Sequence, residues 1–175
     1  AHGGAVNGAT VTAVEYGDGI FNKTVLTFTA TPLTLADATV GAGVKVYDFP
    51  AGRINIISAV GAITLTTTSA LATTLNASVT YNWGIGTTTQ ANGTLATTEQ
   101  NILTTANGTA SATVNVAGAA AVGGVAASAG NLDGTGTAID AYLNIGIAAV
   151  GDIDGDATVT VTGTVTITWI YESDQ

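Results

Sequence analysis

The chain has 175 residues, of which 46% are hydrophobic and 9% are charged, and its formal net charge at pH 7 is −9. The acidic balance excludes the basic patch that binds nucleic acid and the polybasic segment that binds an anionic membrane surface, and the absence of cysteine excludes disulfides, thiolate catalysis and cysteine-ligated metals. A typical soluble domain carries about 25% charged residues, so we expect part of this surface to contact other protein.

The first residues of the chain, 1–9, are small and rich in glycine and follow no hydrophobic period. We predict a flexible N-terminal arm there, of the kind that either stays disordered or docks on a neighbouring element. Residues 10–175 are predicted to form a single β-sandwich domain, since one all-β domain of this length is common. Ala1 fits removal of an initiator methionine and also proteolytic processing, and the sequence leaves both open.

Apolar and polar side chains alternate in most stretches of the chain. Alternation with a period of two places them on opposite faces of a strand, and residues that favour turns separate the stretches. About eight strands with turns between them favour an all-β fold, either an antiparallel β-sandwich or a barrel. The predicted strands are 10–16, 23–31, 43–49, 53–68, 75–83, 110–117, 138–148 and 157–171.

Three of the connections carry predictions of their own. Residues 33–40 follow Pro32 and are predicted to be a connection or a short edge strand, because proline cannot donate to a sheet ladder. Residues 95–104 fit a short helix and a loop equally well. Residues 118–136 are predicted to form a long flexible loop, which in a compact domain is commonly functional or buried in a contact.

The alternation is most regular in the last predicted strand, 157–171, where threonine occupies one face and large apolar residues occupy the other. β-Branched residues of this kind pack well on a pleated surface. The apolar positions are Val159, Val161, Val165, Ile167 and Trp169. Gly163 interrupts that face, where a bulge, a bend or close approach of another backbone is usual. Because Gly61 interrupts the stretch 53–68 in the same way, these two strands could lie beside one another across a sandwich.

The sequence offers few groups for catalysis. His2 is the only histidine and lies in the predicted arm, where no neighbour would hold it near the proton that a general base abstracts. No G-x-S-x-G, P-loop or H-E-x-x-H motif is present. The chain is therefore predicted not to be an enzyme, and no catalytic residue or organic cofactor is assigned.

One acidic cluster is a candidate metal site. Asp152, Asp154 and Asp156 stand close together in a turn that contains glycine, and closely spaced carboxylates are ligands that Ca²⁺ prefers. Asp133 and Asp140 could join them only if the fold brings their loops to the same place. The other interpretation is a solvated hairpin turn, in which Asp and Gly are the expected residues.

The two tryptophans, Trp83 and Trp169, are the largest side chains of the chain. Sugar-binding clefts of glycosidases combine two facing carboxylates with aromatic stacking, and only 6% of these residues are aromatic. We therefore predict that both tryptophans are anchors of the core or of an interface rather than a carbohydrate platform.

The C-terminal half of the chain resembles a family of viral proteins. The segments that carry the resemblance are LNASVTYNWGIGTTT at 75–89, DGTGTAIDAYLNIGIA at 133–148 and ATVTVTGTVTITWIYESD at 157–174. They are similar to segments of tailed-phage virion auxiliary proteins, which are small, jelly-roll-like β-sandwiches that decorate capsids or form head fibres. The resemblance implies a homo-oligomer, with a trimer as the first candidate, seated on the outer capsid surface over the major capsid protein of a bacteriophage.

Three hypotheses for the function follow. The first is a capsid decoration or cement protein, a structural protein of the virion that stabilises the shell by binding it. The second is a receptor- or carbohydrate-recognition module, such as a fibre or adhesin domain with a calcium-supported loop, which would be extracellular. The third is a self-assembling coat or filament subunit.

Overall fold

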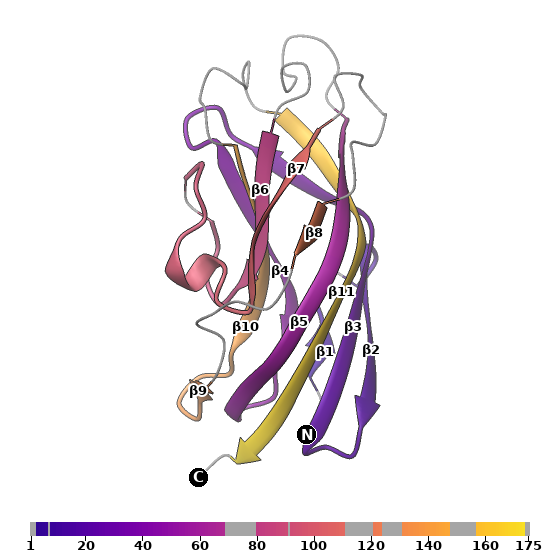
Figure 1. Ribbon diagram of the computed structural model, residues 1–175, viewed down its shortest axis with the longest axis vertical. Helices are drawn as coiled ribbons and strands as arrows, with labels where there is room; N and C mark the ends of the chain where they lie inside the picture. Colours follow the sequence, from indigo (N-terminus) through magenta and orange to yellow (C-terminus); the bar gives the residue numbers. More distant parts are fainter. Residues whose placement is uncertain are drawn as a thin grey trace.

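The computed structural model describes residues 3–6, 8–68, 80–90, 92–110, 121–123, 131–147 and 157–173. Two antiparallel sheets pack face to face in this part of the chain (Figure 1), so the prediction of an all-β sandwich is confirmed. The one helix of the described residues is the single-turn η1, Thr97–Glu99. No helix of the described segments is long and apolar enough to cross a membrane.

The strands of each sheet follow one another in space in an order that differs from their order in the chain. The first sheet, sheet A, contains β1 (Gly4–Ala5), β4 (Gly41–Asp48), β10 (Asp140–Ile147), β6 (Thr80–Gly86) and β7 (Leu103–Thr109). The second, sheet B, contains β2 (Val11–Gly17), β3 (Phe21–Leu35), β11 (Ala157–Ser173), β5 (Gly52–Thr67) and β8 (Ala121–Gly123), and β9 (Asn131–Gly134) also pairs with β5.

The connectivity of these strands is that of a jelly roll. The orders β3-β11-β5-β8 and β4-β10-β6-β7 mean that the chain crosses from one sheet to the other between β3 and β4, between β4 and β5, and between β5 and β6. The last strand, β11, then lies between the two earliest long strands of its sheet (Figure 1). Double-sheet jelly rolls of this kind occur in viral capsid and lectin domains.

The last predicted strand behaves as its alternation indicates. The apolar side chains of β11 from Val159 to Trp169 are buried in the core, and its threonines lie on the opposite face. β5 and β11 are direct neighbours, with Gly61 opposite Val165 and Gly163 opposite Ile63. A Cβ on Gly61 would lie 2.6 Å from a methyl carbon of Val165, so the glycine permits the close approach of the two strands.

Two bulges keep the long strands facing the core. β3 inserts one extra residue where Val161 pairs with Thr31 and Gly163 pairs with Phe28, and Ala30 in that bulge has φ 49°. β5 inserts Ile57 in the same way opposite β11. Each extra residue shifts the alternation by one position, so apolar residues before and after the bulge point to the same side.

The connections differ from the predictions in three places. β3 continues through Pro32 to Leu35. β2 pairs with β3 as far as Phe28, and the Thr29 N–H and the Thr31 hydroxyl both donate to Thr10 O. Pro32 lies beyond these contacts, at an edge position that tolerates proline. β7 takes up the end of the stretch 95–104 and η1 its beginning. The predicted loop 118–136 contains β8 and β9, which both pair with β5.

Parts of three predicted strands lie outside the described residues. These parts are 75–79, which precede β6, 111–117, which follow β7, and 148, which follows β10. Within the predicted arm, β1 pairs with β4, and the Gly3 N–H donates to Glu15 Oε1 at 3.0 Å. The described part of the arm therefore docks on its own chain. His2 lies outside the described residues.

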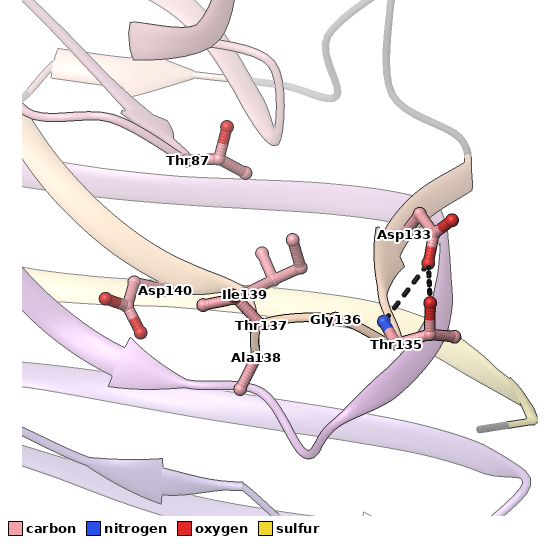
Figure 2. Close-up of a pocket in the computed structure, with 8 residues that line it drawn as sticks. All are labelled: Thr87, Asp133, Thr135, Gly136, Thr137, Ala138, Ile139 and Asp140. Atoms are coloured by element: carbon pink, nitrogen blue, oxygen red, sulfur yellow. Dashed lines mark hydrogen bonds between the residues drawn. The ribbon is translucent and has the colours of Figure 1, made fainter.

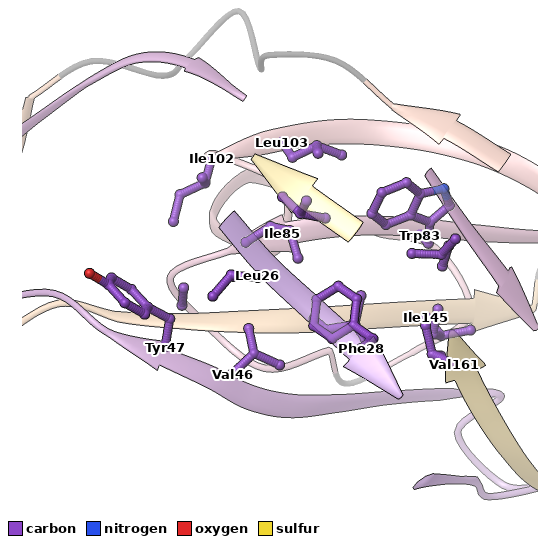
Figure 3. Close-up of a cluster of buried hydrophobic side chains, with 14 of the residues drawn as sticks. Leu26, Phe28, Val46, Tyr47, Trp83, Ile85, Ile102, Leu103, Ile145 and Val161 are labelled. Atoms are coloured by element: carbon purple, nitrogen blue, oxygen red, sulfur yellow. The ribbon is translucent and has the colours of Figure 1, made fainter. Parts of the chain in front are cut away.

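The core lies between the two sheets (Figure 3). Trp83 and Trp169 are both fully buried there, so of the two predicted roles, anchors of the core or of an interface, the structure shows the core. Trp169 meets Phe49 edge to face at 5.4 Å between ring centroids and donates its Nε1–H to Thr24 Oγ1 at 2.9 Å. Thr24 in turn donates to the Tyr47 hydroxyl at 3.4 Å, so a polar chain crosses the core beside the rings.

Candidate functional site

An open depression of about 750 Å³ lies at one end of the sandwich (Figure 2). It is formed by the end of β9, the connection from β9 to β10 and the start of β10. Asp133 and Asp140 both line it, so the fold places these two carboxylates at one feature. Its lining residues are Thr87, Asp133, Thr135, Gly136, Thr137, Ala138, Ile139 and Asp140. The candidate ligands Asp152, Asp154 and Asp156 lie outside the described residues.

Asp133 is engaged by its own turn. Its Oδ1 accepts from the Thr135 hydroxyl at 2.7 Å and from the Thr135 backbone N–H at 3.1 Å, which Figure 2 shows as dashed lines. These two hydrogen bonds, the hydroxyl bond first, lower the pKa of Asp133, and Arg53 adds a smaller electrostatic contribution. The carboxylate therefore caps a turn and stays ionised.

Asp140 belongs to a small ion network on sheet A. Lys45 Nζ lies 2.6 Å from Asp48 Oδ1 and 3.0 Å from Asp140 Oδ1, and the Tyr142 hydroxyl donates to Asp140 Oδ2 at 3.3 Å. Burial alone would raise the pKa of Asp140, but the hydrogen bonds, led by that from Lys45, hold this pKa below its ordinary value. Hydrogen bonds to Asp48 and then to Asp140 raise the pKa of Lys45. One cation thus compensates two carboxylates.

The chemistry available at this depression is limited. Its carboxylates already accept hydrogen bonds or an ion pair, and no histidine lines it. The described residues contain no group of three or more His, Cys, Asp or Glu side chains that could hold a metal ion. The depression therefore offers hydroxyl, carboxylate and backbone groups for polar contacts, without a nucleophile and an adjacent base.

The outer face of sheet A is covered by the chain itself. The connection between β6 and β7 lies across it, and the buried side chain of Asn144 on β10 holds that connection in place. Asn144 Nδ2 donates to Thr88 O at 2.9 Å and to Glu99 O at 2.8 Å, and its Oδ1 accepts from the Gln90 N–H at 2.8 Å. Both N–H groups and the carbonyl oxygen of this buried amide therefore have hydrogen-bond partners, as buried polar groups generally do.

A second amide and several glycines complete this covered face. Asn82 Nδ2 donates to Gly93 O at 2.9 Å and to Gly146 O at 3.0 Å. Gly84 leaves room for the connection, because a Cβ there would lie 3.0 Å from Leu95 Cδ2. Sequence analysis missed this arrangement, although the run of Asn and Gly at alternate positions of β6 and β10 was its visible signal. Sheet A offers no open face to a partner over this area.

The outer face of sheet B is open. Among the described residues, every large apolar side chain that is strongly exposed, between 48% and 61%, lies on a strand of sheet B or on its β2–β3 turn. These residues are Val14, Tyr16, Ile20, Phe21, Ile57 and Val60. Sequence analysis identified the threonine face of β11 but not its apolar neighbours.

The antiparallel register aligns the outward side chains of β2, β3, β11 and β5 in rows. The central row is Val14, Val25, Thr166 and Val60. On one side of it lies the row of Thr12, Thr27, Thr164 and Ala62. On the other side lies the row of Tyr16, Lys23, Thr168 and Ser58. Beyond the Lys23 row lies a fourth row, which consists of Phe21, Ile170 and Asn55. We call these four rows the open face. Lys23 is its one charged side chain.

Comparison of the chain with family models, curated proteins and solved structures gives no match. A function must therefore be inferred from the geometry of these three surfaces.

Proposed function

We propose that this chain is a non-enzymatic structural protein of a virion, a decoration or cement protein that binds the outer surface of the major capsid shell and stabilises it. The observation that carries the proposal is the open face, a surface four strands wide whose rows carry a single charged side chain, in a chain of net charge −9. Large exposed apolar patches on a protein surface are characteristic of interaction sites.

The physical reason is the cost of removing charge from water. Burying an ion without a well-placed partner costs several kcal/mol, whereas a threonine hydroxyl can donate and accept, and so can exchange its water contacts for protein contacts. A surface of valine, threonine and aromatic side chains is thus well suited to permanent burial. A cement protein needs such surfaces, both between its own copies and against the shell, because it stabilises a shell only through the area that it buries.

Two further observations support this proposal over an enzyme. The depression near Asp140 contains an ion network and a capped turn rather than a nucleophile with its base. The jelly-roll connectivity is shared by viral capsid proteins and by lectins, and because one fold carries many functions it serves here only as an analogy.

A recognition module is the second candidate. The feature that favours it is the lining of the depression, where Thr87, Thr135 and Thr137 stand beside Asp133 and Asp140. Hydroxyl and carboxylate groups of this kind form hydrogen bonds with sugars. The shallow opening and the absence of an aromatic side chain from this lining make it the weaker proposal.

The test is co-sedimentation. Virus particles from the genome that encodes this chain are prepared without this protein, and the purified chain is then added to them. We expect the chain to move with the particles through a density gradient and to raise the temperature at which they release their genome. A chain that stays at the top of the gradient and leaves that temperature unchanged overturns the proposal. Binding to a glycan array instead would select the recognition module.

A further inference from the structure

We infer that the open face of sheet B is a contact surface for a second copy of this chain, which stacks its own open face against the first about a two-fold axis. The inference rests on the proposed structural role and specifies one contact through which that role is performed. The size, the charge and the chemistry of the face support it.

The size of the face fits a stable interface. Strands lie about 4.8 Å apart and rise about 3.3 Å per residue. The face continues beyond the four rows along β11, and its full length runs from Ile170 to Thr158. Over this length the outer surface of the four strands has a projected area of roughly 700 Å². Standard protein–protein interfaces bury about 800 Å² on each partner. The open face with this continuation is large enough for a dimer without help from the remainder of the surface.

The charge of the face permits two identical copies to meet. With a net charge of −9, two copies repel one another through most of their surfaces. The open face has no acidic side chain in its rows, although Glu172 borders the last row and accepts a hydrogen bond from Asn55 Nδ2 at 3.3 Å. Its single cation, Lys23, lies 5.9 Å from the ring centroid of Tyr16. A partner that is strongly basic or strongly acidic would find no complementary charge there.

The order of the rows is self-complementary. Consider a two-fold axis that lies between the two stacked sheets and runs parallel to the central row, across the strands. This axis places the row of Lys23 in one copy opposite the row of Thr12 and Thr27 in the second copy. The two lysines then face threonine rather than each other, and the valines of the two central rows meet. Threonine hydroxyls serve as donors and acceptors alike, and sheets stack face to face at about 10 Å.

The test measures mass in solution. For the full chain we expect light scattering to give twice the chain mass of 17.1 kDa. The variant Val14→Lys/Val60→Lys should halve that mass, because both side chains are exposed in the single chain and only the second copy would bury them. The matched control Asn107→Lys/Thr109→Lys adds the same two charges at exposed positions of β7 in sheet A and should leave the mass unchanged.

A second variant tests the geometry without disturbing the contact. The chain has no cysteine, so Thr166→Cys introduces one thiol in the central row. A short bismaleimide should link two copies of this variant and should not link two copies of Thr109→Cys. Thermal unfolding of each variant, followed by circular dichroism, verifies that it is folded.

Three results overturn the inference. The first is a full chain that stays monomeric at high concentration, and the second is a solution mass equal to three chains. The third is a mass that the variant Val14→Lys/Val60→Lys leaves unchanged. A monomeric chain that nevertheless co-sediments with particles would sink this inference and leave the proposed function standing. A dimer that does not bind the particles would support this contact and overturn the proposed function.

Discussion

Asn144 is the residue on which the covering of sheet A depends. Its neighbours on β10, Leu143 and Ile145, point into the core, so strand alternation puts Asn144 on the outer face. From the sequence such a residue would be expected to point into water. The structure buries it completely beneath the β6–β7 connection and gives it three hydrogen bonds.

We therefore expect Asn144→Ala to destabilise the chain by about 3 kcal/mol, since each buried group left without its partner costs about 1–3 kcal/mol. Urea denaturation followed by tryptophan fluorescence measures the change. Asn107→Ala, at an exposed position of β7, is the control and should change stability by less than about 0.5 kcal/mol. A loss below about 1 kcal/mol for Asn144→Ala would show that the connection is held by other contacts.

At the scale of elements, the fold depends on the pairing of β5 with β11, the two longest strands. The interrupting glycines suggested that these strands could lie beside one another across a sandwich, whereas the register makes them direct neighbours within one sheet. The bulges at Ala30 and Ile57 were not predicted, because a bulge is fixed by the partner strand across the sheet. Without them, half of each long strand would turn its apolar side chains to water.

Gly163 is the glycine that this pairing requires. Its φ is 151°, in a region that favours glycine, and a Cβ there would overlap the carbonyl oxygen of Ala62. We expect Gly163→Ala to lower the free energy of unfolding by roughly 2–4 kcal/mol, from backbone strain and displacement of β5. Gly136→Ala is the control, since a Cβ at Gly136 meets nothing within 4 Å. Equal melting temperatures for the two variants would contradict this account.

The whole molecule combines a large net charge with a nearly neutral open face. Most charged groups of the described residues lie in turns or near the ends of strands, as do Asp48 and Asp140, which flank Lys45. This separation leaves the centre of the open face of sheet B nearly free of charge. It also means that the dependence of stability on pH arises at the ends of the sandwich.

The pH dependence has a definite sign. The pKa of Asp18 is lowered by backbone N–H groups of Ile20 and then Phe21, and the pKa values of Asp133 and Asp140 are lowered as well. A carboxyl with a lowered folded pKa contributes stability above its unfolded pKa, about 3.9 for Asp. That stability is lost as the pH falls below this value towards the folded pKa.

We therefore expect the melting temperature to fall as the pH decreases from about 4 to 2, and to fall less steeply in Asp140→Asn. At pH 7 that variant should lose only about 0.5 kcal/mol, because the ion pair is partly exposed to solvent. Calorimetry across this pH range measures both effects. Equal slopes for the two proteins below pH 4 would show that Asp140 gains nothing from its partners.

The sequence by itself determined which side chains share a strand face, because a strand alternates its side chains whatever its partners are. That local rule predicted the buried face of β11, with Trp169 on it, and the all-β class. The turn at Asp152, Asp154 and Asp156 lies outside the described residues, and its calcium site stays a prediction.

Only the tertiary structure decided the rest. The pairing of β8 and β9 with β5, the bulges that rephase β3 and β5, and the burial of Asn144 all depend on residues far away in the chain. The same is true of the open face, whose rows exist only once four strands are in register. Alternation shows that a side chain lies on the outer face of its strand, away from the core of the sandwich. Only the packed fold determines whether water, a loop or another protein covers that side chain.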